Sequence, residues 1–127
     1  MKKNKEFDMW WNQAMEDLDT AQVNSKAKKY YAAILFCQQS IEKALKALWL
    51  KEKSEDLPFI HDLNLLGKKL NLPEKFFATL KELTSSYTET RYPDSSNIIP
   101  SKKFSKKDAA KYVKNSKMVI KWIKERI

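Results

Sequence analysis

Apolar positions along this chain recur every three or four residues, a pattern that predicts an all-α protein. The most apolar segment runs from about Lys28 to Glu52 and contains neither Gly nor Pro. Apolar side chains would cover most of its circumference, so we expect this helix at the centre of a helical bundle. Its strong polar groups fall on a single ridge with spacing i, i+3, i+4 and i+7: Gln39, Glu42, Lys43 and Lys46.

The same periodicity predicts the surrounding elements. A first helix is expected over about Lys5 to Asn24, with Asp17 and the other acidic residues on the side opposite its apolar positions. A short helix fits Asp62–Leu70, and a fourth carries the apolar stripe of 76–87. Asp94–Lys103 is expected to be a polar loop. After it, Ser105-Lys106-Lys107-Asp108 has the spacing of a capping box and starts the last helix. The prediction is an up-and-down helical bundle of four long helices plus one short helix, in one domain over residues 1–127.

Composition removes several classes of function. The chain of 127 residues has one Gly and one Cys, which excludes glycine-rich phosphate loops, an internal disulfide framework and a cysteine-based zinc site. With His61 as the only histidine and no acidic ligand spacing, we expect no metal and no cofactor. The longest apolar run is too short to span a bilayer, and the first residues lack the apolar core of a signal peptide. We therefore expect a cytoplasmic protein without a membrane segment.

The net charge of +9 is concentrated in the last fifth of the chain. Two acidic residues there accompany ten basic ones: Lys102, Lys103, Lys106, Lys107, Lys111, Lys114, Lys117, Lys121, Lys124 and Arg126. Such a surface would attract nucleic acid or an acidic protein. It is also typical of a solvated lysine-rich helix face. This second interpretation is favoured because Arg126 is the single arginine of the segment and lysine makes poorer bidentate phosphate contacts.

Two single residues are candidates for chemistry. His61, just before the short helix, is placed to donate a hydrogen bond, to act as an acid or base, or only to occupy a turn. Arg91 stands at the end of the fourth helix, where its charge suits the helix dipole or an ion pair with a neighbouring acid. Alternatively, Arg91 reaches over the central helix, with Glu42 as its buried partner and Gln39 as a hydrogen-bond neighbour.

These residues together resemble the HEPN domain family, helical domains named for their occurrence in higher eukaryotes and prokaryotes. The resemblance covers about nine-tenths of the chain. It rests on an ordered set of motifs: Trp11-x-x-Ala14-x-x-Asp17-Leu18-x-x-Ala21, Tyr31, Phe36-x-Gln38-Gln39-Ser40-x-Glu42-Lys43-Ala44-Leu45-Lys46-Ala47, His61-Asp62-Leu63, Arg91-Tyr92-Pro93-Asp94 and Lys121-Trp122-Ile123. It implies a bundle that commonly forms homodimers and often pairs with a small nucleotidyltransferase, in some cases as a toxin–antitoxin system.

Many HEPN toxins are metal-independent ribonucleases that use an arginine followed, after four to six residues, by a histidine. Arg91 matches the arginine, but Ser96, Asn97 and Ile98 hold the positions of the histidine, and none of them is an imidazole acid or base. The resemblance thus places the chain in the branch with Arg-Tyr-Pro-Asp, usually described as nucleotide-binding or as the partner of a nucleotidyltransferase.

Three hypotheses follow. In the first, the protein is a non-catalytic or weakly catalytic dimer that binds a nucleotide or a nucleotidyltransferase through Arg91, Glu42, Gln39, Lys43, Lys46 and His61. In the second, it is a ribonuclease toxin with an altered site, in which Arg91 and His61 are the catalytic candidates and RNA is the substrate. In the third, the basic last helix binds an acidic protein partner.

Overall fold

The computed structural model describes residues 2–53, 55–95 and 97–127, and in these ranges all the regular structure is helical. The elements are α1 (Lys2–Lys26), α2 (Tyr30–Glu52), α3 (Leu63–Lys69), α4 (Phe77–Glu89), α5 (Pro100–Lys103) and α6 (Lys106–Arg126), with 3₁₀ turns at Glu74–Phe76 and Pro93–Ser95. The predicted all-α fold class is therefore confirmed, with α3 as the short helix. No helix in the described part of the chain is long and apolar enough to cross a membrane.

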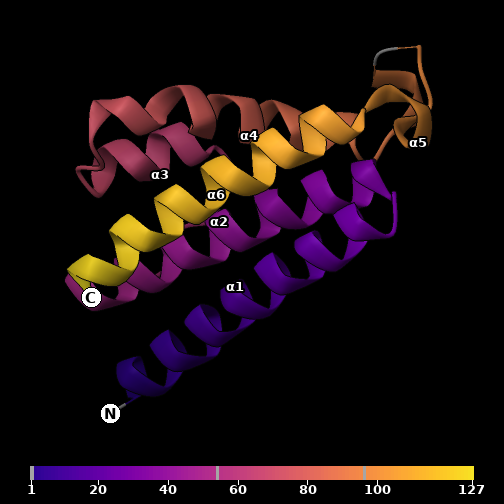
Figure 1. The fold of residues 1–127 in the computed structure, drawn as a ribbon. Coiled ribbons are helices and arrows are strands. Elements are labelled where there is room, and N and C mark those ends of the chain that lie inside the picture. Colours follow the sequence, from indigo (N-terminus) through magenta and orange to yellow (C-terminus); the bar gives the residue numbers. More distant parts are fainter. Residues whose placement is uncertain (1, 54, 96) are drawn as a thin grey trace.

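Helix α2 lies at the centre of the bundle. In Figure 1, α1 and α2 form an antiparallel hairpin, α6 runs alongside α2 in the same direction, and α3 with α4 covers another side. The two chain ends lie at the same end of the bundle (Figure 1). This arrangement explains why α2 is apolar around most of its circumference: it contacts α1, α3, α4, α5 and α6.

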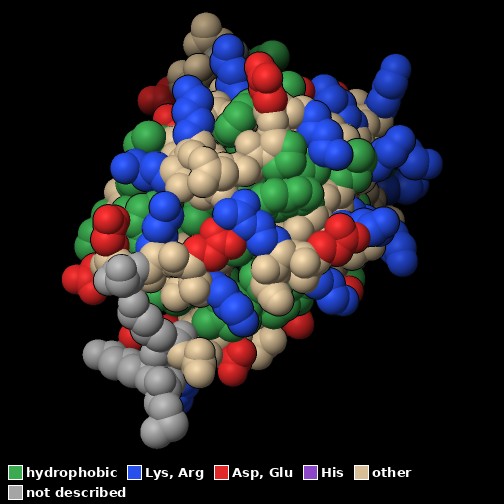
Figure 2. Space-filling view, turned by 90° about the vertical axis from the view of Figure 1, so that its left-hand side faces the viewer, with side chains coloured by type: hydrophobic (Ala, Val, Ile, Leu, Met, Phe, Trp, Pro, Cys, Tyr) green, Lys and Arg blue, Asp and Glu red, His purple; other side chains and the backbone are tan. Residues whose placement is uncertain are grey.

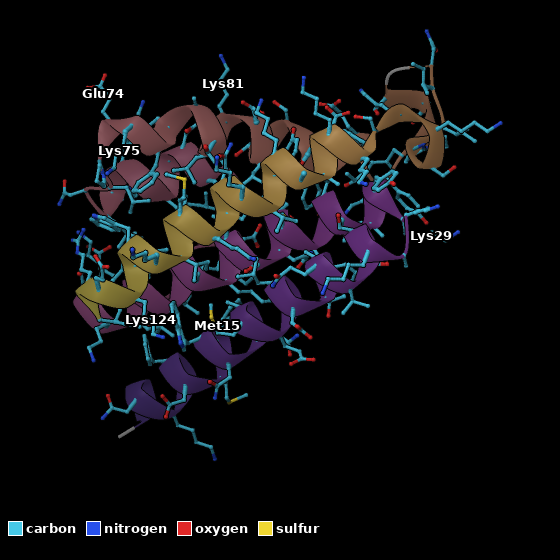
Figure 3. The ribbon with its side chains drawn as sticks, viewed as in Figure 1. Met15, Lys29, Glu74, Lys75, Lys81 and Lys124 are labelled. Carbon is cyan, nitrogen blue, oxygen red and sulfur yellow. The ribbon has the colours of Figure 1, made fainter. Side chains whose placement is uncertain are left out.

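Buried aliphatic side chains from several helices form one core. Small residues on α1 and α2, such as Ala14, Ala44 and Ala47, are completely buried, as expected where two helix backbones approach closely. The hydroxyl of Ser40 donates a hydrogen bond of 2.8 Å to the carbonyl of Ala14, which ties α2 directly to α1. Met15 projects from α1 toward the other helices, whereas Lys81 projects from α4 away from the bundle (Figure 3).

Local sequence signals define two helix starts. Ser105 accepts a hydrogen bond from the backbone of Asp108, and the Asp108 carboxylate accepts one from the backbone of Ser105, so the predicted capping box is present. Asp62 caps α3 by accepting from the backbone N–H groups of Asn64 and Leu65. The single glycine, Gly67, lies where α3 and α4 approach, because an added Cβ would come within 2.7 Å of a side-chain carbon.

The segment expected to be a polar loop, Asp94–Lys103, is more regular than predicted. It contains α5, which begins with Pro100 at a first-turn position where the missing N–H costs no hydrogen bond. The ion pair between Lys103 and Glu89 then links α5 to the end of α4. The pattern of polar residues in this segment was a poor guide because a four-residue helix carries no periodicity to detect.

Candidate functional site

Three side chains donate hydrogen bonds to the carboxylate of Glu42. Gln38 Nε2 lies 2.9 Å from Oε1 and Lys46 Nζ lies 3.2 Å from Oε2. Both donors are one turn away on α2, where i and i+4 side chains share a face. The third donor, His61, comes from the connection before α3, with Nδ1 3.0 Å from Oε1 and 3.2 Å from Oε2. The Glu42 side chain is only 12% exposed, so donors nearly enclose it.

The surroundings of Glu42 favour its ionised form. Burial alone would raise the pKa of this carboxyl, but the hydrogen bond from His61, the charge of Lys46 and the hydrogen bond from Gln38 outweigh burial. The pKa of Glu42 consequently lies below its ordinary value of 4.5. A carboxylate only accepts hydrogen bonds, so His61 donates from Nδ1. Its side chain is 61% exposed, and Nε2 has no hydrogen-bond partner among the described residues.

Arg91 lies just past the end of α4 and is held by neutral groups. Its Nη1 donates to the carbonyl of Tyr87 at 2.8 Å, and its Nη2 donates to Oε1 of Gln38 at 3.4 Å. Its guanidinium carbon also lies 3.9 Å from the centre of the Tyr87 ring, a cation–π distance. No carboxylate within residues 2–53, 55–95 and 97–127 forms an ion pair with Arg91.

The ring of Tyr87 joins Arg91 to His61. The imidazole of His61 stacks on Tyr87 with ring centres 5.2 Å apart and an interplanar angle of 27°. One tyrosine therefore contacts both of the residues singled out for chemistry. We call these six residues the Glu42 cluster: Gln38, Glu42, Lys46, His61, Tyr87 and Arg91.

Lys46 is the most buried cation of the cluster, with 8% of its side chain exposed. Besides Glu42, it contacts the ring of Trp10 on α1, 5.6 Å from the ring centre. The lysine is thus fixed between a carboxylate and an aromatic face. This position lets Lys46 neutralise Glu42 without being presented to solvent.

Gln39 and Lys43 lie on the other edge of the polar ridge and face α1. Lys43 forms an ion pair with Asp17 and also donates to Oε1 of Gln39 at 3.0 Å. Gln13 donates to the other oxygen of Asp17 at 2.9 Å. The expectation that Asp17 lies on the polar side of the first helix is wrong: this residue is 4% exposed because it pairs with α2. This edge connects two helices and contains no contact to Arg91 or His61 among the described residues.

The polar ridge predicted from the spacing thus has two sets of partners: Asp17 of α1 on one edge, and His61 and Arg91 on the other. The structure brings Glu42, Lys46, His61 and Arg91 into one cluster, and it places Gln39 and Lys43 elsewhere. The hydrogen-bond neighbour of Arg91 is Gln38, not Gln39, and its link to Glu42 runs through that amide. Gln38 does not belong to the i, i+3, i+4, i+7 ridge that begins at Gln39, so the spacing does not select it, and Tyr87 fits the apolar stripe of α4. The sequence signal that could have identified Gln38 is its place next to Gln39 in the motif that resembles the HEPN family.

Of the positions that replace the family's histidine, Ser96 lies outside the described residues. Asn97 is exposed with φ of 59°, and Ile98 is 49% exposed. The left-handed backbone at Asn97 is one that asparagine tolerates better than most residues. The imidazole next to Arg91 comes from His61 instead, through the ring of Tyr87 that both residues contact.

Among the described residues, the two groups with strongly raised pKa values, Cys37 and Tyr112, offer no competing site. Burial raises the pKa of the Cys37 thiol to about 12, which keeps it protonated and unreactive. Burial, followed by the charges of Glu82, Glu89 and Asp108, likewise raises the pKa of Tyr112 to about 12. In the described parts of the chain, no group of three His, Cys, Asp or Glu residues is arranged to hold a metal. The Glu42 cluster combines a positioned imidazole with an arginine that has no acidic partner among the described residues.

The fold and the cluster together define a class: a helical bundle in which an imidazole and a guanidinium contact the same tyrosine ring, and the imidazole binds a carboxylate of the central helix. The family profile of the HEPN domain matches residues 7–127, and the chain belongs to the HEPN domain family. Proteins of this family use the fold for nucleotide binding or ribonuclease activity and often form dimers.

Two solved structures are similar to this one over nearly the whole chain. TT1696 from Thermus thermophilus is 25% identical, with a TM-score of 0.88 over 95% of this chain and 98% of the other. ST0689, described as an archaeal HEPN homologue, is 26% identical, with a TM-score of 0.81 over 94% of this chain and 96% of the other. No curated protein matches the chain.

Proposed function

We propose that the Glu42 cluster is a phosphate-recognition site that binds a nucleotide. The observation that carries this proposal is the state of Arg91, a fixed guanidinium without an acidic partner among the described residues. An arginine that is oriented by neutral groups keeps its charge and remaining N–H donors for an external anion. Glu42 supports this state because Lys46 and His61 already bind its carboxylate. Within the described residues, the acceptors of Arg91 are neutral: the carbonyl of Tyr87 and the amide of Gln38.

Aromatic surface beside Arg91 supports a nucleotide over a simple anion. Tyr92 follows Arg91 in the chain and is 50% exposed, and the ring of His61 is also largely exposed. Bases stack on such rings while a phosphate contacts a nearby cation. The site thus offers the two kinds of contact that a nucleotide needs.

The test is the effect of ATP on thermal unfolding of the wild-type protein and of Arg91→Gln. A ligand that binds only the folded state raises the melting temperature, by an amount equivalent to about 2.7 kcal/mol at a hundredfold excess over its Kd. We expect ATP to stabilise the wild type and to leave Arg91→Gln unchanged. Lys81→Gln is the matched control, because it also removes one positive charge from the α4 region but projects into solvent (Figure 3). Loss of the ATP shift in both variants, or in neither, would contradict the proposal.

We also propose that the protein is a homodimer whose interface includes the surface beside the Glu42 cluster. Phe59, two residues before His61, is fully exposed, and Ile98 and Ile99 are 49% and 47% exposed after Arg91. Exposed large apolar side chains of this kind are typical of protein interfaces. Light scattering coupled to size exclusion should report a dimer for the wild type and a monomer for Phe59→Asp. A monomeric wild type would contradict this part of the proposal.

The family implies a nucleotidyltransferase as partner protein and a toxin–antitoxin type of pairing, and we propose both for this chain. An adjacent gene for a small nucleotidyltransferase, and a complex between the two purified proteins, are the expected findings. Absence of complex formation at micromolar concentration would contradict the pairing while leaving the nucleotide site to its own test.

The second candidate function is a metal-independent ribonuclease in which His61 supplies the imidazole. It is favoured by the contact of His61 with Glu42, because a carboxylate on Nδ1 fixes the tautomer that leaves Nε2 free to accept a proton. In such a reaction Nε2 would take the proton of a ribose 2′-hydroxyl as its oxygen attacks the neighbouring phosphorus. The bond to the 5′-oxygen would break, that oxygen would take a proton from water, and Arg91 would stabilise the charge on the phosphate.

Incubation of purified protein with single-stranded and structured RNA in the presence of EDTA distinguishes the two functions. Cleavage that leaves 2′,3′-cyclic phosphate ends and disappears in His61→Ala and Arg91→Gln would establish the ribonuclease. Intact RNA with the wild type would remove this candidate and leave nucleotide binding as the function of the cluster.

A further inference from the structure

A groove runs between α1 and α6, away from the Glu42 cluster. It is open to solvent, and its volume is about 510 Å³. The α6 wall is formed by Ala110, Val113, Lys114, Lys117 and Met118. The spacing of these residues is i, i+3, i+4, i+7 and i+8, so they form one face over about two helical turns, roughly 12 Å long.

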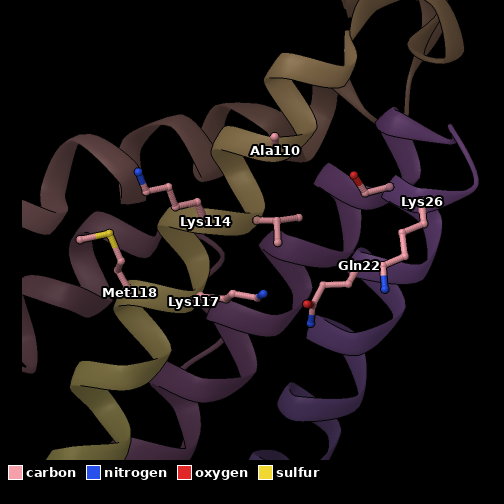
Figure 4. Close-up of a pocket in the computed structure, with 8 residues that line it drawn as sticks. Gln22, Lys26, Ala110, Lys114, Lys117 and Met118 are labelled. Carbon is pink, nitrogen blue, oxygen red and sulfur yellow. The ribbon is translucent and has the colours of Figure 1, made fainter.

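The α1 wall consists of Gln22, Ser25 and Lys26, again on one face of the helix. Figure 4 shows Lys117 extending from α6 toward Gln22, with Lys26 extending beside Gln22 from the other wall. The two ammonium groups therefore converge on the groove from opposite helices. Between the walls the surface is mainly apolar, and Ala110, Val113 and Met118 are the apolar residues that α6 contributes.

The charge of this groove is not neutralised locally. No acidic residue lines it, and Lys26, Lys114 and Lys117 have no ion pair among the residues that the structure describes. The ion pairs of the basic last segment involve Lys103, Lys111 and Arg126 instead, which lie outside the groove. A neighbouring hollow of about 300 Å³ shares Ser25 and Lys26 and adds two more lysines, Lys28 and Lys106.

The basic edge of the molecule is visible in Figure 2. Basic side chains gather along the right-hand edge, the side that α6 occupies at the front of Figure 1. Over the rest of that face, acidic and basic side chains are interspersed. In this view, basic side chains therefore predominate on the α6 side.

The residues that line the α1–α6 groove indicate which class of partner it can bind. Single-stranded nucleic acid is typically held by aromatic side chains on which bases stack and by arginine, and this groove has neither. A second copy of the chain is disfavoured at this groove because a symmetric contact would bring the lysines of the two grooves together with no acidic lining residue between them. An apolar floor between two helices, bordered by lysines, matches instead an amphipathic helix with an apolar stripe and acidic flanks.

We infer that the α1–α6 groove is a docking site for an acidic amphipathic helix of a partner protein. The apolar stripe of that helix lies on Val113 and Ala110, and its acidic flanks pair with Lys26 and Lys117. The bound helix adds a further member to the bundle beside α1 and α6. This site is independent of the nucleotide site at the Glu42 cluster, and each can fail without the other.

The test uses a fluorescein-labelled helical peptide of about 14 residues, ~20 Å long, with leucines at i, i+3, i+4 and i+7 flanked by glutamates. Its binding to the full chain is followed by fluorescence anisotropy. A scrambled peptide of the same composition and labelled polyuridylate are measured in parallel. We expect the amphipathic peptide to bind more tightly than either, and added salt to weaken its binding.

The variant Lys26→Glu/Lys117→Glu should weaken peptide binding by at least about tenfold, because both rim charges become repulsive. Lys121→Glu/Lys124→Glu is the matched control, since it reverses two α6 charges outside the groove and also places one glutamate in the last turn of a helix. All four lysines are exposed, so both variants should fold, which circular dichroism verifies. The control should bind the peptide within about threefold of the wild type.

Three results would overturn the inference. Equal weakening by both double variants would show diffuse attraction to a basic surface. Tighter binding of polyuridylate, lost in Lys26→Glu/Lys117→Glu, would assign the groove to nucleic acid. Equal binding of the amphipathic and scrambled peptides, or no binding of either, would remove the helix as the occupant.

Discussion

The two edges of the polar ridge on α2 have nearly the same composition and different roles. On one edge, Asp17 of α1 is satisfied by Lys43 and Gln13, so the carboxylate is enclosed between two helices. On the other edge, Glu42 is satisfied by Gln38, Lys46 and His61. Each edge thus buries a carboxylate with a lysine and a glutamine, and each obeys the rule that buried charges are paired.

The edges differ in what lies beyond the carboxylate. The partners of Asp17 connect α1 to α2 and present no free charge to a ligand. The partners of Glu42 lead outward, through Gln38 to Arg91 and through His61 to a largely exposed imidazole. A buried ion pair is therefore weak evidence for a site, and unpaired charge next to one is stronger evidence.

The largest predicted effect is that of Glu42→Gln on stability. This change leaves Lys46 without its carboxylate in a position where only 8% of the side chain is exposed. Breaking one member of a buried ion pair costs several kcal/mol, and we expect about 3 kcal/mol here. Denaturant unfolding of the two proteins measures the difference. A loss below about 0.5 kcal/mol, the usual range for surface changes, would show that the cluster is not an enclosed network.

Acidification should remove the stabilisation that the ionised carboxylate of Glu42 provides. The pKa of Glu42 in the folded protein lies below its ordinary value of 4.5, so its stabilisation is fully present above pH 4.5 and is lost as the pH falls through the lowered folded pKa. The stability difference between wild type and Glu42→Gln should therefore shrink as the pH drops below 4.5. Urea unfolding over a pH series from about 3 to about 7 follows this difference. A difference that grew toward low pH would mean that the folded pKa is raised.

Asp17→Asn should destabilise the protein by a smaller amount, about 2 kcal/mol. Its partner Lys43 has a side chain 24% exposed and can regain water when the carboxylate is lost, unlike Lys46. ATP should still raise the melting temperature of Asp17→Asn, because this edge only joins the helices. An Asp17→Asn protein that remained folded but lost the ATP shift would break the division into a structural edge and a binding edge.

Gln38 and Gln39 are adjacent in the sequence and lie at different edges of the ridge, and their substitution should change stability less than that of Glu42 or Asp17. Gln38 is fully buried and bonds both Glu42 and Arg91, so Gln38→Ala should cost about 1.5 kcal/mol and weaken the ATP shift. Gln39 is half-buried and only accepts from Lys43, so Gln39→Ala should stay within about 0.5 kcal/mol with the ATP shift intact. Thermal unfolding with and without ATP measures both effects. A larger effect of Gln39→Ala than of Gln38→Ala, on stability and on the ATP shift, would support the sequence-based assignment of Gln39 to the site.

Gln38 and Gln39 also show which features can be predicted from the sequence and which cannot. Periodicity identified α2 as the central helix, and the local spacing of Ser105 and Asp108 identified a cap, because both depend on neighbours within a few residues. Which edge of the ridge faces Arg91 depends on where α1 and α4 pack, and adjacent residues on a helix differ by about 100° in direction. The division between Gln38 and Gln39, and the burial of Asp17 against Lys43, therefore required the tertiary arrangement.

His61 and Arg91 illustrate the same limit for the site. Each was recognisable as a singular residue, yet they are thirty positions apart in the sequence and meet through the ring of Tyr87. That ring was assigned to the apolar stripe of its helix, since a half-buried tyrosine fits the stripe equally well. Only the approach of the connection before α3 to the end of α4 reveals its second role.

The central claim is that Arg91 is the cation that receives a phosphate, and side-chain NMR tests it most directly. The chain has two arginines, so the Nε–Hε region of a ¹⁵N-correlated spectrum should contain two arginine signals. Arg126 pairs with Glu52 at 2.6 Å, far from the cluster in sequence, and serves as an internal control. Addition of ATP should shift the Arg91 signal, assigned with Arg91→Gln, and leave the Arg126 signal in place. An unmoved Arg91 signal at saturating ATP, or equal movement of both signals, would contradict the account.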